Sequence, residues 1–154
     1  MSTINCKGTL INLSTPKVMG IVNVTPDSFF DGGKLTNSNE IVLQVEKMLR
    51  DGATFIDLGG YSSKPGADFV FEAEELNRVV PIVKVLVEKF PDILLSIDTF
   101  RSEVAKQAIE QGAALINDIS AGLLDENMLE TIAKLQVPYI MMHMKGTPKT
   151  MQSL

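Results

Sequence analysis

The sequence predicts an α/β fold in which a parallel sheet is connected by helical crossovers. Short apolar runs alternate with amphipathic helical patterns along the chain, and polar residues follow each apolar run. Continuous apolar runs are typical of strands buried on both faces, and their alternation with helices indicates parallel pairing. An open doubly wound sheet would carry a glycine fingerprint after its first strand. Because polar groups instead end every strand, we favour a (β/α)8 TIM barrel.

The first part of the chain predicts a hairpin, a buried strand and a helix. Residues 3–13 alternate loosely around Lys7-Gly8, which is typical of a short hairpin. The apolar run that starts at Val18 turns polar at Asn23 and becomes a loop from Pro26. Residues 39–50 carry one apolar stripe and therefore predict a helix.

The remaining residues continue the same alternation. Strands are expected over residues 53–60, 93–99, 113–119 and 137–144, and helices over residues 102–111 and 126–135. The helical pattern of residues 72–90 contains Pro81, which has no backbone N–H, so we expect a kink there or two separate helices.

Chain length limits the domain organisation. A complete barrel usually takes about 250 residues, and this chain of 154 residues shows five predicted units. We therefore expect a single incomplete barrel domain over residues 1–154. Its N-terminal hairpin occupies residues 1–17, and the first five β/α units occupy residues 18–154.

Composition excludes several classes of partner. The chain has 14 basic and 19 acidic residues and a net charge of −5, which argues against nucleic acid and anionic membrane surfaces. Cys6 is the only cysteine, so no intrachain disulfide forms, and we interpret it as structural. No signal peptide or run of ~18–20 apolar residues is present. We therefore expect a cytoplasmic protein without membrane partners.

Five segments carry a family resemblance. They are MGIVNVTPDSFFDGG at 19–33, DLGG at 57–60, SIDT at 96–99, INDI at 116–119 and MHMKGTPKTMQ at 142–152. In this order and at these spacings they closely resemble dihydropteroate synthase, and the first motif is highly specific. The resemblance implies a transferase of folate biosynthesis, which joins 4-aminobenzoate to dihydropterin-methyl diphosphate and releases diphosphate. It also implies a homodimer of the complete enzyme, with small molecules as substrates.

The resemblance also implies roles for residues at the strand ends. Asn23 corresponds to the residue beside Mg2+ and diphosphate, Asp98 and Asn117 to the residues that read the pterin, and Met142 to a wall of the pterin slot. A carboxylate and an amide on neighbouring strands can pair with adjacent ring nitrogens. An amide oxygen is a suitable hard ligand for Mg2+, which retains several waters.

Two loops carry the other implied contacts. Ser63 and Lys64 correspond to residues that meet diphosphate, Phe29 and Pro65 to residues that flank aminobenzoate, and Asp31 to one that orders the first loop. The amine of aminobenzoate attacks the pterin methylene after diphosphate leaves, so the resemblance implies no protein nucleophile.

This chain departs from the family in its second loop and in its length. It has Tyr61-Ser-Ser-Lys-Pro where relatives commonly have Glu-Ser-Thr-Arg-Pro, and lysine lacks the bidentate fork of arginine. The later strands of the family, which supply further pterin and anion contacts, are not found here. We therefore expect the chain alone to be nearly inactive.

Alternative interpretations of these residues stay open. Asp98 could cap the following helix, Asn117 could satisfy loop backbone, and His143 is more often a packed core residue than a catalytic one. At the level of function, the alternatives are a methyltetrahydrofolate–corrinoid methyltransferase barrel and a non-catalytic paralogue.

Overall fold

The computed structural model describes residues 2–24, 36–61 and 69–146. Its elements follow the predicted order of a hairpin and then alternating strands and helices. They are β1 (Thr3–Cys6), β2 (Thr9–Asn12), β3 (Met19–Asn23), α1 (Thr36–Arg50), β4 (Phe55–Gly59), α2 (Glu72–Lys89), β5 (Leu95–Asp98), α3 (Ser102–Glu110), β6 (Leu115–Asp118), α4 (Met128–Leu135) and β7 (Tyr139–Met141).

The N-terminal hairpin forms as predicted. Strands β1 and β2 pair antiparallel, with Cys6 opposite Thr9. The two turn residues, Lys7 and Gly8, have φ angles of 54° and 82°. Two consecutive residues of positive φ match the right-handed twist of the strands that they join.

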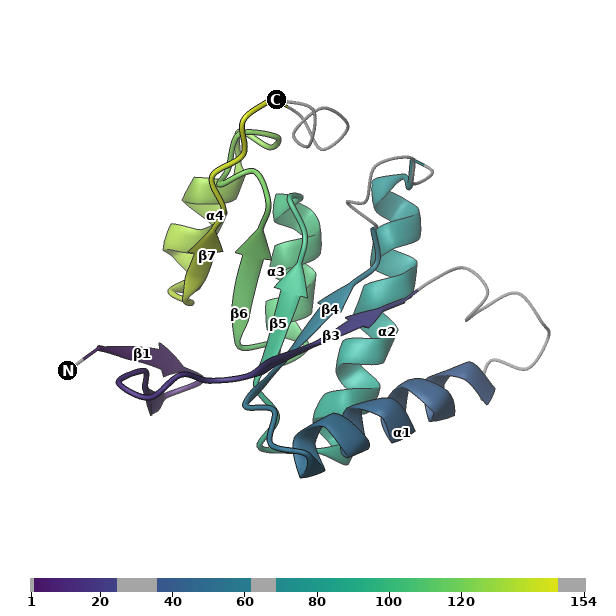
Figure 1. Cartoon of the computed structure of the whole chain (residues 1–154). Coiled ribbons are helices and arrows are strands. Elements are labelled where there is room, and N and C mark those ends of the chain that lie inside the picture. Colours follow the sequence, from purple (N-terminus) through teal and green to yellow (C-terminus); the bar gives the residue numbers. More distant parts are fainter. Residues whose placement is uncertain (1, 25–35, 62–68, 147–154) are drawn as a thin grey trace.

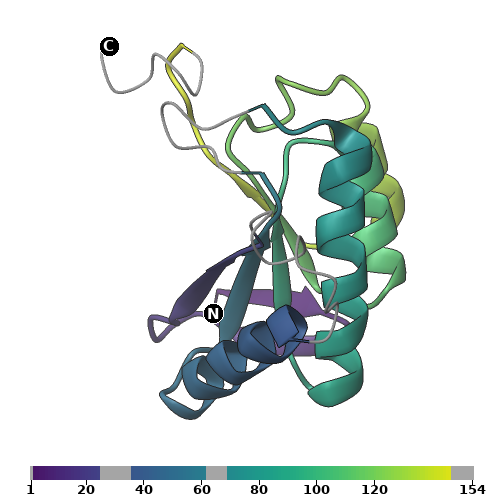
Figure 2. The ribbon, with the colours of Figure 1, turned by 90° about the vertical axis from the view of Figure 1, so that its right-hand side faces the viewer.

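The main sheet has five parallel strands in the order β3-β4-β5-β6-β7, which is also their order in the chain. Because parallel crossovers are right-handed, strands added successively in one direction place all their helices on the same face. The helices accordingly cover one face of the sheet (Figures 1 and 2). A doubly wound sheet would reverse its strand order, so the arrangement is part of a (β/α)8 barrel, and the predicted fold class is confirmed.

The principal core lies between this sheet and its helices. Alternate residues of each strand face the helices, and the amphipathic helices return an apolar stripe to them. Fully buried members include Ile56, Leu58, Ile97 and Ile116 from the strands and Leu86 from α2. Each such side chain contributes about 1.5–3 kcal/mol by leaving water.

A smaller cluster closes the amino ends of the strands. Cys6 of the hairpin is fully buried against Phe55, Ala114 and Leu115. Burial raises the pKa of the Cys6 thiol, as expected for a structural cysteine. The hairpin therefore covers the inner face of the sheet at one end and leaves the carboxyl ends of the strands uncovered by it.

Two boundary predictions need correction. Helix α2 continues through Pro81, so of the two predicted alternatives, a kink or two separate helices, the second is wrong. Pro81 is exposed, while Val79, Ile82 and Val83 on the opposite side of the helix are buried in the core and hold it together. The strands are also shorter than their apolar runs, because residues such as Val137 pack in the core beyond the strand ends. No helix in the described ranges has both the length and the apolar character needed to cross a bilayer.

Candidate functional site

Polar residues from three strands lie in one row at the carboxyl ends of the sheet. Asn23 pairs in register with Gly59, Gly59 with Asp98, and Asp98 with Asn117. Residues in register in a parallel sheet point to the same face, and neighbouring strands are about 4.8 Å apart. Asn23, Asp98 and Asn117 therefore share the inner face, which the helices do not cover (Figure 2).

A second polar level lies one pleat below this row. Asp57 precedes Gly59 by two residues on β4, and its Oδ2 accepts a hydrogen bond of 3.1 Å from Nδ2 of Asn117. Asp57 is 5% exposed. Its Oδ1 and the Oγ of the neighbouring Ser96 have no hydrogen-bond partner among the described residues. Because an unpaired buried polar atom costs about 1–3 kcal/mol, this face keeps polar groups that do not serve stability.

Asp98 lies in an unusual electrostatic environment. Burial, followed by the negative charges of Asp57, Glu75 and Asp118, raises its pKa from 3.8 to about 7. Near neutral pH, protonated and ionised forms are therefore both populated. The protonated form can donate a hydrogen bond and the ionised form only accepts, so this carboxyl can meet either a donor or an acceptor on a ligand.

Gly59 lies between Asn23 and Asp98 in this row and has no side chain. A Cβ atom at Gly59 would lie 3.4 Å from Oδ2 and 3.5 Å from Cβ of Asp98. With no side chain there, the inner face between the two polar residues is backbone only.

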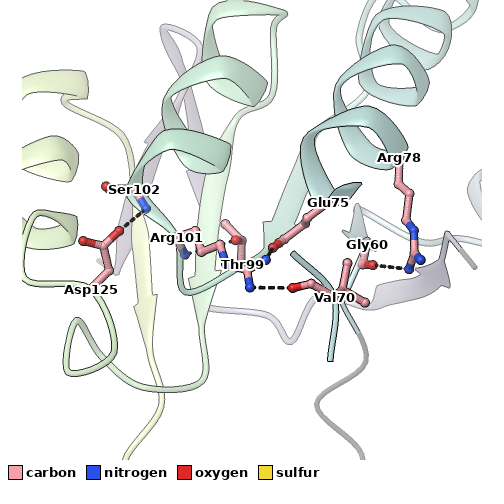
Figure 3. A network of polar contacts seen from close by, with 8 residues as sticks. All are labelled: Gly60, Val70, Glu75, Arg78, Thr99, Arg101, Ser102 and Asp125. Carbon is pink, nitrogen blue, oxygen red and sulfur yellow. Dashed lines mark hydrogen bonds and ion pairs between the residues drawn. The ribbon is translucent and has the colours of Figure 1, made fainter. Parts of the chain in front are cut away.

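Arg101 connects the segments beyond β4 and β5 (Figure 3). Its guanidinium forms a buried ion pair with Glu75 of α2, and its Nη2 donates a hydrogen bond of 2.6 Å to the carbonyl oxygen of Val70. Burial raises the pKa of Glu75, while Thr99 and Arg101 oppose this rise. The same guanidinium lies 5.0 Å from the ring centroid of Phe100.

Arg78 holds the other side of the same segment (Figure 3). Its Nη1 donates a hydrogen bond of 3.0 Å to the carbonyl oxygen of Gly60, and its Nη2 pairs with Glu74. A Cβ atom at Gly60 would lie 2.6 Å from Cγ2 of Val79, so α2 packs directly against this backbone. Two arginines therefore hold Gly60 and Val70, which lie shortly before and after residues 62–68, against the helical layer.

Asp118 follows Asn117 but serves the fold. Its Oδ1 accepts hydrogen bonds of 2.7 and 2.8 Å from the backbone N–H and hydroxyl of Ser120. Its Oδ2 accepts from the N–H of Gly122 at 2.8 Å and from the hydroxyl of Tyr139 at 2.6 Å. Burial and this hydrogen bond raise the pKa of Tyr139. Asp118 is therefore a buried anchor of the loop after β6.

Comparison with known proteins places this chain in a family. The family model described as pterin binding enzyme matches residues 19–154, which include the row and all five parallel strands. This chain belongs to the pterin-binding enzyme family.

Similar proteins are named as dihydropteroate synthases or folic acid synthesis proteins. The chain is 49% identical to dihydropteroate synthase of Haemophilus influenzae over 143 residues, which are 93% of this chain and 51% of that protein. It is 53% identical to the folic acid synthesis protein fol1 of Schizosaccharomyces pombe over 136 residues, which are 88% of this chain and 18% of that protein. The chain thus spans about half of the bacterial relative and less than a fifth of the yeast protein.

Solved structures of dihydropteroate synthases are similar to the structure of this chain. Dihydropteroate synthase of Yersinia pestis, in a sulfonamide drug complex, superposes with a TM-score of 0.87 at 46% identity, covering 99% of this chain and 55% of that one. The enzyme of Xanthomonas albilineans with 4-aminobenzoic acid gives a TM-score of 0.83 at 43% identity, covering 93% and 52%.

The structure brings together part of the predicted pterin-binding site. Asn23, Asp98 and Asn117 lie in one row, as the sequence predicts, and the binding roles of their side chains stay predictions. Met142 follows β7, is 38% exposed, and its N–H donates to the carbonyl oxygen of Asp118 at 3.1 Å. The other predicted contacts lie outside the described residues. They are Phe29, Asp31, Ser63, Lys64 and Pro65.

Other residues of this member of the pterin-binding enzyme family differ from expectation. His143 is exposed, so its interpretation as a packed core residue is wrong in this structure; it lies beyond the short β7. The contacts of Asp57 and Arg101 were not predicted from the sequence. Asp57 stands inside an otherwise apolar strand run, and that signal could have indicated a buried functional carboxyl.

Asn23 fits a metal site in which the substrate supplies some of the metal ligands. Asn23 is exposed at the end of β3 and offers one amide oxygen. Among the described residues, no group of three His, Cys, Asp or Glu side chains could hold a metal ion. Mg2+ commonly binds through one or two protein oxygens, substrate phosphates and waters, and Asn23 fits that pattern.

Proposed function

We propose that this chain supplies the pterin- and diphosphate-binding part of a dihydropteroate synthase. The reaction joins 4-aminobenzoate to (7,8-dihydropterin-6-yl)methyl diphosphate and releases dihydropteroate and diphosphate. The observation that carries this proposal is the in-register row of Asn23, Asp98 and Asn117 on the inner face at the carboxyl ends of the strands. The names of the relatives support it.

Recognition of the pterin is assigned to Asp98 and Asn117. A pterin edge presents amino and ring nitrogens side by side, and a carboxyl beside an amide can pair with them in a fixed register. A carboxyl with a pKa of about 7 suits this task, because it can donate or accept as the ring edge requires. Met142 is assigned to a wall of the same slot.

Asn23 is assigned to Mg2+ and the diphosphate. The metal would offset the negative charge that develops on the departing diphosphate. Asp98 and Asn117 bind and orient the pterin, and the amine of 4-aminobenzoate attacks its methylene carbon. The two loops retain their proposed roles, with Ser63 and Lys64 at the diphosphate. Phe29 and Pro65 would flank aminobenzoate, and Asp31 would order the first loop.

Location and assembly complete the proposal. A cytoplasmic protein is supported by the acidic composition and the single cysteine. A homodimer is proposed for the whole protein, and sedimentation of that protein would test it.

The function is tested by product formation and ligand binding. The purified chain is incubated with the pterin diphosphate and 4-aminobenzoate, with and without Mg2+, and diphosphate release is measured beside the Haemophilus enzyme. We expect Mg2+-dependent release far slower than that of the complete enzyme, and pterin binding by calorimetry. Methyl transfer from methyltetrahydrofolate to a corrinoid would contradict the proposal. Pterin binding with no diphosphate release would favour the non-catalytic paralogue.

Replacement of Gly59 by alanine should separate binding from stability. The added methyl group meets Asp98 at ordinary contact distances, so we expect the free energy of unfolding to stay within about 1 kcal/mol of the wild type. The same methyl projects into the row and should weaken pterin binding at least about tenfold. In contrast, Gly60→Ala brings a Cβ to 2.6 Å from Val79 and should destabilise the fold. Unchanged pterin affinity in Gly59→Ala would place the ligand elsewhere.

A further inference from the structure

Asp57 is a buried carboxyl that the proposed reaction does not use. It lies on β4, whereas its hydrogen-bond partner Asn117 lies on β6, and β5 runs between them. The Asn117 side chain therefore reaches across β5, at a level between Ser96 and Asp98, to meet Asp57. This contact joins the lower polar level of the inner face to the row that we assign to the pterin.

The chemistry of the two groups determines how the Asn117 amide is turned. A carboxylate only accepts hydrogen bonds, so the amide must direct its NH2 group toward Asp57. The structure has this arrangement, with Nδ2 of Asn117 donating to Oδ2 of Asp57 at 3.1 Å. The carbonyl oxygen Oδ1 of Asn117 then points away from Asp57, and no described residue donates a hydrogen bond to it.

We infer that Asp57 is a positioning residue that sets the donor–acceptor pattern of the ligand-reading edge, by holding Asn117 so that its Oδ1 faces the ligand as an acceptor beside Asp98. This inference rests on the proposed function. It predicts selection of a 2-amino-4-oxo ring edge, which offers an amino donor next to a ring-nitrogen acceptor. A ligand edge with an acceptor in place of the amino donor would require the Asn117 amide to turn by 180°. Asp57 would then lose the hydrogen bond that the NH2 group donates to it.

A purely structural role for Asp57 would predict a different environment. Asp118, a buried carboxylate that serves the fold, has both oxygens satisfied by four hydrogen bonds. Glu75 leaves its Oε1 without a partner among the described residues, but it has the guanidinium of Arg101 as a counter-charge. Asp57 has one oxygen bonded to Asn117, and its Oδ1 is without a partner among the described residues. The bond to Asn117 is therefore the principal contact that this carboxyl makes.

Selectivity between two ring systems tests the inference. The two probes are pterin and lumazine. Lumazine has an oxo group in place of the 2-amino group and carries a proton on N1, so its edge presents an acceptor where pterin presents a donor, and a donor where pterin presents an acceptor. We expect the wild-type chain to prefer pterin by at least about tenfold. In Asp57→Asn the new amide can donate or accept, so Asn117 is free to turn, and the preference should fall to within about threefold.

A matched variant controls for disturbance of the inner face. Ser96→Ala removes the neighbouring buried hydroxyl, which has no partner among the described residues, and leaves the Asn117 contact intact. It should retain the full preference for pterin. If Asp57→Asn also retains it, or weakens both ligands equally, Asp57 does not set the pattern.

Hydrogen exchange of the Asn117 side chain tests the orientation without a ligand. In the wild type, the Asn117 NH2 protons should exchange more slowly than those of the exposed Asn77, and Asp57→Ala should remove this difference. Equal rates for Asn117 and Asn77 in the wild type would overturn the inference. Failure of the wild type to bind either ring would contradict the proposed function, and the exchange rates would still decide the orientation.

Discussion

Replacing Arg101 by methionine should lower the free energy of unfolding by about 3–5 kcal/mol. The guanidinium is the partner of Glu75, which is 0% exposed, and its loss leaves a buried carboxylate without a counter-charge. The carbonyl oxygen of Val70 also loses its donor. Equilibrium unfolding in urea, followed by circular dichroism, measures the change.

Two further variants show whether burial of the ion pair causes this effect. The double variant Arg101→Met with Glu75→Met removes both charges and should recover much of the lost stability, because no unpaired charge stays buried. Lys134 pairs with Glu130 on the surface, where the side chains are 72% and 69% exposed. Lys134→Met should therefore change stability by less than about 1 kcal/mol. An Arg101→Met variant as stable as Lys134→Met would contradict the assignment of a buried pair.

Asp98→Asn should make the protein more stable above neutral pH and change how stability depends on pH. The folded state raises the pKa of Asp98 from 3.8 to about 7, so between these values the folded state binds a proton that the unfolded state has lost. Stability therefore falls as pH rises through this window, by up to about 1.4 kcal/mol per pH unit from this group. Above pH 7 Asp98 is ionised in the folded state and destabilises the fold by the full amount. Asparagine at this position carries no charge, so the free energy of unfolding should rise by about 2–4 kcal/mol.

Unfolding measured at several pH values between 4 and 8 tests this prediction. The wild type and Asp98→Asn should have similar stability near the acid end and diverge toward pH 7. Asp92→Asn, in the exposed turn before β5, serves as a matched control and should leave the pH dependence as in the wild type. Parallel curves for Asp98→Asn and wild type would show that the Asp98 carboxyl is not perturbed in the folded state.

Local patterns predicted the elements of this protein well, because they depend on residues close in sequence. Continuous apolar runs correctly indicated five parallel strands, and the alternation around Lys7-Gly8 indicated the hairpin. The central strands β4, β5 and β6 are largely buried, whereas the edge strands β3 and β7 are partly exposed. The interruption at Pro81 was misleading. A proline weakens a helix locally, but the packing of Val79 and Val83 in the core keeps α2 continuous.

The sequence by itself determined that polar side chains would meet at one rim, because parallel strands end on the same side and Asn23, Asp98 and Asn117 each stand at a strand end. Only the tertiary structure decided that Asn117 reaches across β5 to Asp57 and that Arg101 pairs with Glu75. Those contacts join residues 60 and 26 positions apart, and they depend on the register and curvature of the sheet and on the packing of α2. No local pattern carries that information, since it arises when distant elements pack together.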